Sequence, residues 1–212
     1  MNVVLYVGSP RKPSNTRSIV SELSRRLREM GHQVRVLDAE RDKQVSEDFV
    51  AESKDALRAA DALVIAAPVY LDLPPHRTLS WLHAIWMRRD EMVGHRLAVY
   101  GISHSGYFEP AHKQVSIEAM AHFCRRMGWS WMGALAFGGT SPIDGRKLED
   151  AGPFSLRPRK TLPQLAICIV DGRPIDAKTS RDAERRPIPL PRRLIVWMMN
   201  WVLQREERKA SG

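Results

Sequence analysis

A short turn near the N-terminus carries the side chains best suited to binding chemistry. Residues 8–16 read Gly-Ser-Pro-Arg-Lys-Pro-Ser-Asn-Thr. Hydroxyl and amide donors and a full positive charge come from Ser9, Ser14, Asn15, Thr16 and Arg11. Donors of these types favour a phosphate group, which accepts several hydrogen bonds and carries negative charge. The turn therefore predicts a cradle for the phosphate of a cofactor, although an ordinary turn with a helix N-cap at Ser14 or Asn15 explains the same residues.

The segments around this turn position it between a strand and a helix. An apolar run at residues 3–7 precedes it. One helical face follows, formed by Ile19, Val20, Leu23, Leu27 and Met30. The unpaired N–H groups and partial positive charge of a helix N-terminus would then face the phosphate. The motifs G-x-x-x-x-G-K-[ST] and G-x-G-x-x-G are absent here, which disfavours nucleoside triphosphate hydrolysis and a dinucleotide-binding Rossmann site.

A second candidate loop, residues 68–75, follows a buried strand predicted at residues 62–67. Prolines occupy three of its eight positions, which makes the loop stiff. Such a loop favours a rigid slot for a flat ring, with Tyr70 as an aromatic wall. The alternative is a turn whose prolines only end the strand and begin a helix at residues 76–87.

A third candidate loop, His104-Ser105-Gly106-Tyr107, follows a strand predicted at residues 96–103. Its aromatic residues beside glycine indicate a wall or lid over a planar ligand. His104 is interpreted as a contact to cofactor or substrate. A metal site is disfavoured, because no Cys or carboxylate stands at ligand spacing from His104 and His112.

The alternation of strands and helices predicts a doubly wound parallel sheet. Further strands are expected at residues 33–37 and 129–137, and further helices at residues 49–60, around 117–124, and at 153–170, with Pro163 in the first turn of the last helix. Ligands of such sheets bind at the carboxyl ends of the strands.

The chain divides into a domain at residues 1–170, a charged, proline-bearing linker at 171–190 and an amphipathic or apolar helix at 191–209. Residues 194–203 are apolar almost throughout and arginines flank them. This run is too short to span a bilayer. It suits either a membrane interface or packing on the domain or across a dimer, and protein packing is favoured because interfacial helices usually show a cleaner polar face.

Composition narrows the function classes. The 212 residues are 43% hydrophobic and 27% charged, with a net charge of +9. We expect a soluble protein without a secretory signal. Two distant cysteines in apolar patterns favour a reducing cytoplasm. Nucleic-acid binding is disfavoured, because basic residues are mixed with acidic ones and no nucleic-acid module is recognisable.

Taken in order, these loops resemble the NAD(P)H-dependent FMN reductase family. The resemblance rests on Gly8-Ser9-Pro10-Arg11 with Ser14-Asn15-Thr16, on Pro68-Val69-Tyr70 with Pro74, and on Ser105-Gly106-Tyr107 with Glu109-Pro110. It implies a flavodoxin-like five-stranded parallel sheet with helices on both faces. It also implies bound FMN, with NADPH or NADH as co-substrate and a homodimer or homotetramer as the assembly.

The resemblance also assigns the residues of the site. Ser9, Arg11, Ser14, Asn15 and Thr16 would hold the FMN phosphate. Pro68, Val69, Tyr70 and Leu71 would border the isoalloxazine ring, and His104, Ser105, Gly106 and Tyr107 would form the loop on its other side. Bulky Tyr107-Phe108 departs from the smaller residues frequent in the family, which leaves the choice of substrate open.

The chemistry implied is hydride transfer from nicotinamide to flavin and then to a small acceptor, such as a quinone, a nitro or azo compound, or free flavin. No protein side chain is expected to act as a nucleophile or metal ligand. A flavodoxin-like electron carrier is one alternative, although flavodoxins present acidic surfaces and this chain is basic. A non-catalytic module recruited through its C-terminal helix is another, and contact with a membrane through residues 191–209 is a third open point.

Overall fold

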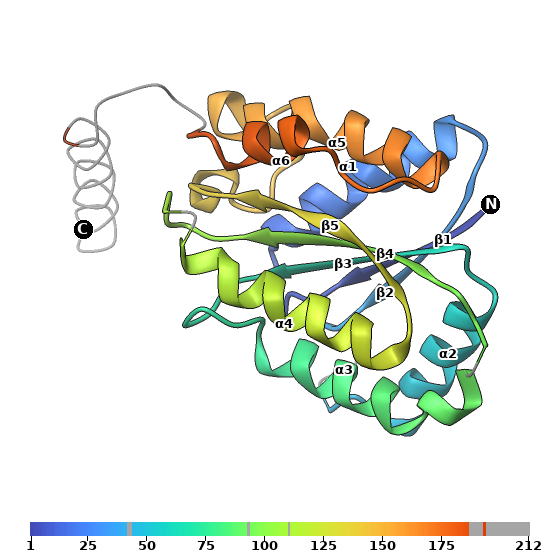
Figure 1. Ribbon diagram of the computed structural model, residues 1–212. Coiled ribbons are helices and arrows are strands. Elements are labelled where there is room, and N and C mark those ends of the chain that lie inside the picture. The colour runs from blue at the N-terminus through green and yellow to red at the C-terminus, as the bar shows by residue number, and fades with distance from the viewer. Residues whose placement is uncertain (42–43, 93, 110, 187–192, 194–212) are drawn as a thin grey trace.

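The computed structural model describes residues 1–41, 44–92, 94–109, 111–186 and 193 (Figure 1). The strands are β1 (Asn2–Val7), β2 (Gln33–Asp38), β3 (Ala62–Pro68), β4 (Ala98–His104) and β5 (Ser130–Phe137). The α-helices are α1 (Asn15–Glu29), α2 (Glu47–Arg58), α3 (His76–Met87), α4 (Ala111–Met127), α5 (Leu156–Val170) and α6 (Ala177–Glu184). Short 3₁₀ turns lie at η1 (Arg89–Met92), η2 (Ser141–Ile143) and η3 (Gly152–Ser155).

The strands form one parallel sheet in the order β2-β1-β3-β4-β5. Helices α1, α5 and α6 cover one face and α2, α3 and α4 cover the other (Figure 1). The predicted doubly wound, five-stranded parallel sheet is therefore confirmed.

Two cores follow from the two faces of the sheet. In β1, the side chains of Val3, Leu5 and Val7 pack toward α1 and α5, while Val4 and Tyr6 pack toward α2 and α3. The strand is apolar without alternation because both of its faces are covered. Tyr6 stacks on Trp81 of α3, with ring centroids 3.9 Å apart.

The strand order reverses between β1 and β3, and this is where an open α/β sheet leaves a crevice. The first turn enters this crevice at Gly8, whose N–H donates to the carbonyl of Ala66 at 2.7 Å. A Cβ on Gly8 would lie only 2.4 Å from Oγ1 of Thr78, and that hydroxyl donates to the carbonyl of Gly8. Glycine is therefore required where the turn crosses α3.

Two predictions about the last part of the domain need correction. Pro163 lies in the middle of α5, not in its first turn, which instead contains Pro158. The expected helix at 153–170 begins as η3 and continues as α5. A proline inside a helix removes one N–H donor, and α5 tolerates this loss within its packed layer.

The segment predicted as a linker, residues 171–190, contains helix α6. Asp176 caps this helix by accepting from the N–H of Thr179 at 2.8 Å, and Ala183 is fully buried. The sequence pattern does not reveal this helix, because only Thr179 and Ala183 are buried and its other residues are mostly polar or charged. The helix predicted at 191–209 lies outside the described residues, apart from Arg193.

Candidate functional site

A cavity of about 290 Å³ opens at the carboxyl ends of the strands. Four loops line it, those that follow β1, β3, β4 and β5. Its lining residues are Ser9, Arg11, Pro13, Ser14, Asn15, Thr16, Pro68, Val69, Tyr70, His104, Ser105, Gly106, Thr140, Ser141, Asp144 and Gly145. Every site residue predicted from the sequence lines this cavity except Leu71 and Tyr107.

The first turn combines a helix cap with free backbone donors. Ser14 is the N-cap of α1, and its Oγ accepts from the N–H of Arg17 at 3.3 Å. The N–H groups of Asn15 and Thr16 have no hydrogen-bond partner in the described part of the chain. Both lie at the start of α1, where the helix dipole favours an anion. These two donors fit a phosphate. Ser14 has two roles, because it caps α1 and also lines the cavity.

Ser9 adds a hydroxyl at the floor of this turn. The residue is 4% exposed, and its Oγ accepts from the N–H of Arg11 at 3.4 Å. The hydroxyl hydrogen of Ser9 remains available as a donor to an anion in the cavity.

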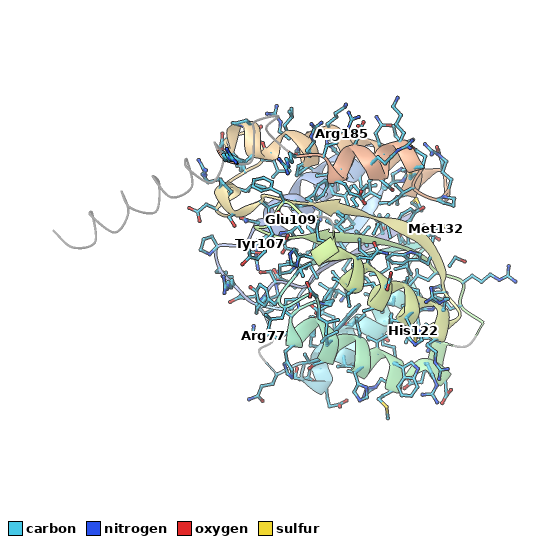
Figure 2. All side chains as sticks on the ribbon, turned by 60° about the vertical axis from the view of Figure 1, so that its left-hand side comes forward. Arg77, Tyr107, Glu109, His122, Met132 and Arg185 are labelled. Carbon is cyan, nitrogen blue, oxygen red and sulfur yellow. The ribbon has the colours of Figure 1, made fainter. Side chains whose placement is uncertain are left out.

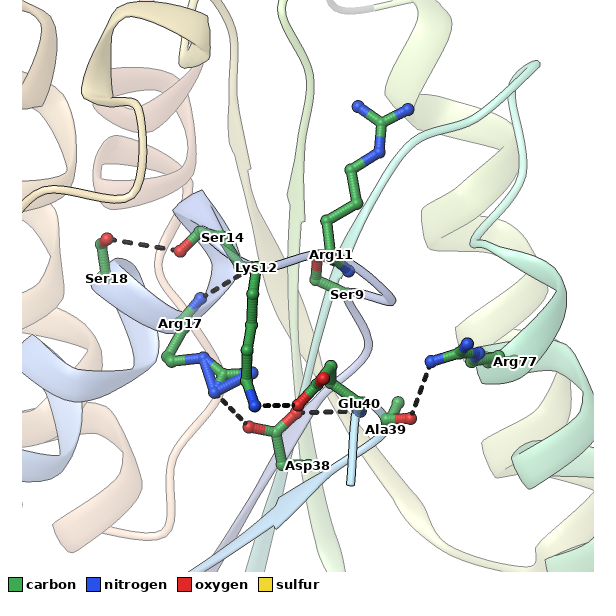
Figure 3. Close-up of polar contacts among 10 residues, drawn as sticks. All are labelled: Ser9, Arg11, Lys12, Ser14, Arg17, Ser18, Asp38, Ala39, Glu40 and Arg77. Atoms are coloured by element: carbon green, nitrogen blue, oxygen red, sulfur yellow. Dashed lines mark hydrogen bonds and ion pairs between the residues drawn. The ribbon is translucent and has the colours of Figure 1, made fainter. Parts of the chain in front are cut away.

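Of three basic side chains in or next to the turn, Lys12 and Arg17 point toward the end of β2 and Arg11 points away from it (Figure 3). Lys12 pairs with Glu40, and Arg17 Nη1 lies 2.7 Å from Oδ2 of Asp38 at the end of β2. Arg11 instead places its guanidinium 5.2 Å from the centroid of the Tyr70 ring. Lys12 and Arg17 therefore hold the turn against β2, while Arg11 stays at the mouth of the cavity.

Asn15 joins α1 to the loop after β5. Its Nδ2 donates to the carbonyl of Thr140 at 2.8 Å, and its Oδ1 accepts from the N–H of Gly145 at 2.7 Å. The sequence-based expectation was that this amide would contact a phosphate directly. In the structure most of its hydrogen-bonding capacity holds the wall of the cavity in place.

His104 lies at the centre of a buried chain of hydrogen bonds. Thr16 Oγ1 lies 2.7 Å from its Nε2, and its Nδ1 lies 3.1 Å from Thr140 Oγ1. Thr140 donates its hydroxyl to the carbonyl of Ser105 at 3.0 Å, so Oγ1 of Thr140 accepts from Nδ1–H of His104. Nε2 then accepts from Thr16. This pattern fixes one neutral tautomer of the imidazole.

Burial reinforces the neutral state of His104. Desolvation, with a smaller contribution from the positive charge of Lys113, lowers the pKa of His104 to about 4. The imidazole is therefore uncharged near neutral pH. It orients the surrounding hydroxyl groups and does not offer a proton to a ligand.

The loop after β3 is a tight, strained turn. Tyr70 N–H donates to the carbonyl of Leu73 at 2.8 Å, and Leu73 N–H donates back at 3.2 Å. Leu71 and Asp72, at φ +50° and +68°, both occupy the left-handed region, as in a type I′ turn. Leu71 is 98% exposed and stands at the tip, outside the cavity.

The loop after β4 faces this turn. Ser105 Oγ donates to the carbonyl of Tyr107 at 2.9 Å, which also accepts from Gly139 N–H. The Gly106 N–H has no hydrogen-bond partner among the described residues. In contrast, the N–H groups of Val69 and Tyr70 already donate to the carbonyls of His104 and Leu73. The N–H of Gly106 is therefore available to donate to a ligand in the cavity, whereas those of Val69 and Tyr70 are not.

Tyr107 lies at the rim of the cavity and not in its lining. Its side chain is 69% exposed, and its ring centroid lies 5.5 Å from that of His112. His112 Nδ1 lies 3.0 Å from Oδ1 of Asp72 in the loop after β3. The two loops thus meet outside the cavity, and Tyr107 and Leu71 expose apolar surface beside its mouth.

A buried lysine supports the loop after β4. Lys113, in the first turn of α4, is 1% exposed and donates from Nζ to the carbonyl of Glu109 at 2.6 Å. Desolvation lowers the pKa of this ammonium group. Nothing in the sequence pattern indicates this burial, since a lysine at the start of a helix is usually solvated.

A larger cavity of about 680 Å³ lies beside the first, between α1 and residues 145–149. Three of its cations are already paired, Lys12 with Glu40, Arg17 with Asp38, and Arg25 with Glu22. No loop that follows β3 or β4 contributes to its lining. It therefore lacks the walls that a planar ring needs. Within the described ranges, no cluster of three His, Cys, Asp or Glu residues suits a metal ion.

The residues that the β5 loop contributes to the cavity are not among the site residues predicted from the sequence. These are Thr140, Ser141, Asp144 and Gly145, and Pro13 was also unassigned. Glycines at 138 and 139, directly after a strand, were the available signal. Glycines in such a position permit close backbone approach to a ligand, but they do not identify the side chains that line a cavity.

Comparisons with known proteins agree with this geometry. The structure resembles an NADH:FMN oxidoreductase (TM-score 0.63, 17% identity, 90% of this chain and 97% of that one). It also resembles the NAD(P)H:quinone oxidoreductase from Methanothermobacter marburgensis (TM-score 0.60, 18% identity, 78% and 96%). A third similar structure is the azoreductase AzrA (TM-score 0.54, 13% identity, 77% and 100%). No curated protein matches the chain.

At these identities the structural likenesses establish the fold. The family is established by a family model, NADPH-dependent FMN reductase, which matches residues 1–125. That match covers more than half of the 212 residues and includes the loops that follow β1, β3 and β4. The chain therefore belongs to the NADPH-dependent FMN reductase family.

Proposed function

We propose that this protein passes hydride from NADPH or NADH through FMN to a small acceptor, namely a quinone, a nitro or azo compound, or free flavin. The observation that carries the proposal is the cavity at the strand ends, with two unpartnered N–H groups at the start of α1 on its floor. An anion-binding helix start beside loops with ring-binding character is the combination that FMN requires.

The residues of the cavity divide between the two ends of FMN. The N–H groups of Asn15 and Thr16 and the hydroxyl of Ser9 would hold the phosphate, with the positive charge of Arg11 at the mouth. The loops at residues 68–70 and 104–106 would border the ring. Asp144 also lines the cavity, and its carboxylate would accept hydrogen bonds from ribityl hydroxyl groups.

FMN, when bound, supplies the hydride acceptor and donor, so no protein nucleophile is needed. The residues of the protein would bind FMN and orient it. Gly106 N–H would donate to a carbonyl at the edge of the ring, where negative charge develops on reduction. The neutral imidazole of His104 keeps Thr16 and Thr140 in place without adding a charge to the cavity.

The acceptor would approach at the exposed rim formed by Tyr107 and Leu71. Both side chains expose apolar surface there. A flat aromatic acceptor would gain stacking and apolar contact at such a rim. The similar structures that are named quinone oxidoreductase and azoreductase support acceptors of this class.

The proposal is tested by anaerobic mixing of the FMN-loaded protein with NADPH or NADH. We expect the flavin absorbance to bleach with at least one nucleotide, and to return when a quinone, azo compound, nitro compound or free flavin is added. Bleaching by dithionite but by neither nucleotide would instead support an electron carrier. Failure to bind any flavin would support a non-catalytic module.

We also propose a homodimer or homotetramer in a reducing cytoplasm. Met87, Val115 and Ile167 expose apolar side chains that do not line the cavity and that a second copy would cover, and Cys124 and Cys168 are buried and unpaired. Light scattering of the purified protein tests the assembly. A monomer at micromolar concentration would contradict it.

A further inference from the structure

The positive charge of this protein is concentrated in its C-terminal part. Residues 155–212 contain 13 Lys and Arg against 6 Asp and Glu, so they carry +7 of the total net charge of +9. The preceding 154 residues, which build the sheet and the cavity, are close to neutral at +2. Such asymmetry indicates a contact with an anionic surface.

The structure gathers part of this charge in one cluster. Nε of Arg157 in α5 donates to the carbonyl of Arg186 at 3.1 Å, which places the start of α5 beside the end of α6. Lys160 and Arg185 each lie 3.4 Å from a carboxylate oxygen of Asp182. We name Arg157, Lys160, Arg185 and Arg186 the basic cluster.

The basic cluster is open to solvent and only partly neutralised. The side chains of Lys160 and Arg185 are 57% and 67% exposed, while that of Asp182 is 16% exposed. Two cations of the cluster thus share a single carboxylate, and Arg157 and Arg186 add two further positive charges beside them. Figure 2 shows Arg185 on the outer side of the α6 layer, across the molecule from His122 of α4.

The cluster stands where the chain leaves the described fold, at Arg186. The sequence beyond it reads Pro-Arg-Arg-Leu-Ile-Val-Trp-Met-Met-Asn-Trp-Val-Leu-Gln-Arg at residues 191–205. Apolar residues with two tryptophans between arginines suit the boundary of headgroups and acyl chains. The ten residues 194–203, nine of them apolar, are too few to cross a bilayer, and no helix of the described residues is long and apolar enough to do so.

We propose that the basic cluster and residues 191–209 together bind the protein to the surface of an anionic phospholipid membrane. The cluster supplies electrostatic attraction, and the apolar segment supplies burial in the interface. Stable membrane attachment generally needs two such signals. If residues 191–209 only packed on the protein, two observations would have no explanation. Arginines flank the apolar run on both sides, and the basic cluster ends at Arg186, shortly before this segment begins.

An anionic membrane explains these observations better than a nucleic acid does. A nucleic acid would use the positive charge but not the apolar run with Trp197 and Trp201. The basic cluster lies on the α5–α6 layer, whereas the flavin cavity lies at the strand ends and none of the four cluster residues lines it. Membrane binding can therefore fail or succeed independently of the proposed reductase activity.

The test is sedimentation of the full-length, FMN-loaded protein with two kinds of vesicle, phosphatidylcholine alone and phosphatidylcholine mixed with phosphatidylglycerol. We expect binding to the anionic vesicles that weakens at high salt, and little binding to the neutral ones. Replacing all four residues of the basic cluster by Gln should lower the partition coefficient at least about tenfold. Trp197→Ser with Trp201→Ser should lower it as well, without removing any charge.

A matched control removes four exposed cations elsewhere, Arg35, Arg58, Arg125 and Arg126, each replaced by Gln. This control should keep most of the vesicle binding, because those residues lie on β2, α2 and α4. Equal loss in the control and the cluster variant would overturn the proposal. So would equal binding to both kinds of vesicle, tighter binding to DNA than to anionic vesicles, or Trp variants that change the oligomeric state and leave vesicle binding intact.

Discussion

The hydroxyl oxygen of Thr16 lies 2.7 Å from Nε2 of His104, in a contact that joins the start of α1 to the end of β4. The two residues are 88 positions apart and both are buried. Through Thr140, the same imidazole also holds the loop after β5. One neutral histidine thus links three of the four loops that line the cavity.

His104 should make the protein sensitive to acid. The native protein keeps this imidazole neutral down to a pKa of about 4, whereas the unfolded chain takes up a proton near pH 6.5. Because the unfolded state then binds more protons, the free energy of unfolding falls as pH drops from 6.5 to 4. The expected contribution is about 3 kcal/mol. Denaturant unfolding at a series of pH values measures it.

The control for this prediction is His104→Gln, which keeps hydrogen-bonding capacity but cannot titrate. Its unfolding free energy should fall less steeply over the same interval. Parallel pH profiles of the two proteins would show that His104 is not the group responsible.

Asn15→Ala should loosen the wall of the cavity. It leaves the carbonyl of Thr140 and the N–H of Gly145 without their side-chain partner. We expect a loss of about 1–3 kcal/mol in the free energy of unfolding, together with weaker FMN binding. Urea denaturation and flavin fluorescence titration measure the two effects. Weaker FMN binding at unchanged stability would mean that Asn15 contacts the ligand directly.

Lys113→Met should lower the midpoint potential of bound FMN. The variant removes a buried cation that acts electrostatically on His104. A positive charge beside the cavity stabilises the negative charge of reduced flavin, and we expect a fall of about 30 mV. Because burial lowers the pKa of Lys113, the difference should be larger at acidic than at alkaline pH.

A spectroelectrochemical titration of the FMN-loaded variant gives this potential. Lys113→Arg keeps the charge and should keep the potential near that of the original protein. If the Met variant has the original potential at every pH, the role of Lys113 is confined to its hydrogen bond with the carbonyl of Glu109.

Leu71→Asn should raise the stability of the protein while lowering its turnover of the acceptor. Leu71 is 98% exposed at φ +50°, a conformation that Asn adopts more readily than Leu. We expect the free energy of unfolding to rise by about 1 kcal/mol. If Leu71 contacts the acceptor, kcat/KM for a quinone should fall while bleaching by NADPH keeps its rate. Unchanged kinetics with both substrates would remove Leu71 from the acceptor site.

The sheet could be predicted because its signals are local. Residues 62–67 are apolar without alternation, as a doubly covered strand should be, and Gly31 ends the first helix at φ +85°. The loops of the site could be located because parallel strands bring their carboxyl ends to one edge. Helix α6 could not be predicted from the sequence. It has only two buried positions, Thr179 and Ala183, and two positions do not produce a recognisable helical periodicity.

The roles of individual site residues depend on contacts across long sequence separations. Asn15 looked like a phosphate donor, but it bonds to residues 125 and 130 positions away. Thr16 likewise forms a hydrogen bond with His104, which is 88 positions away. Sequence reasoning identifies a donor-rich turn, whereas only the packed loops decide which donors stay free. Here these are the backbone N–H groups of Asn15 and Thr16.

The central claim is that the cavity holds FMN by its phosphate, and a comparison of FMN with riboflavin tests it most directly. Dissociation constants of both flavins should be measured by fluorescence for the original protein, for Ser9→Ala and for a control, Ser24→Ala, whose serine does not line the cavity. Ser9→Ala should weaken FMN binding about tenfold, because it removes a hydrogen bond to a charged group. Riboflavin binding should be unchanged, and so should both flavins with the control. A loss of equal size for FMN and riboflavin, or no preference of the original protein for FMN, would contradict the account.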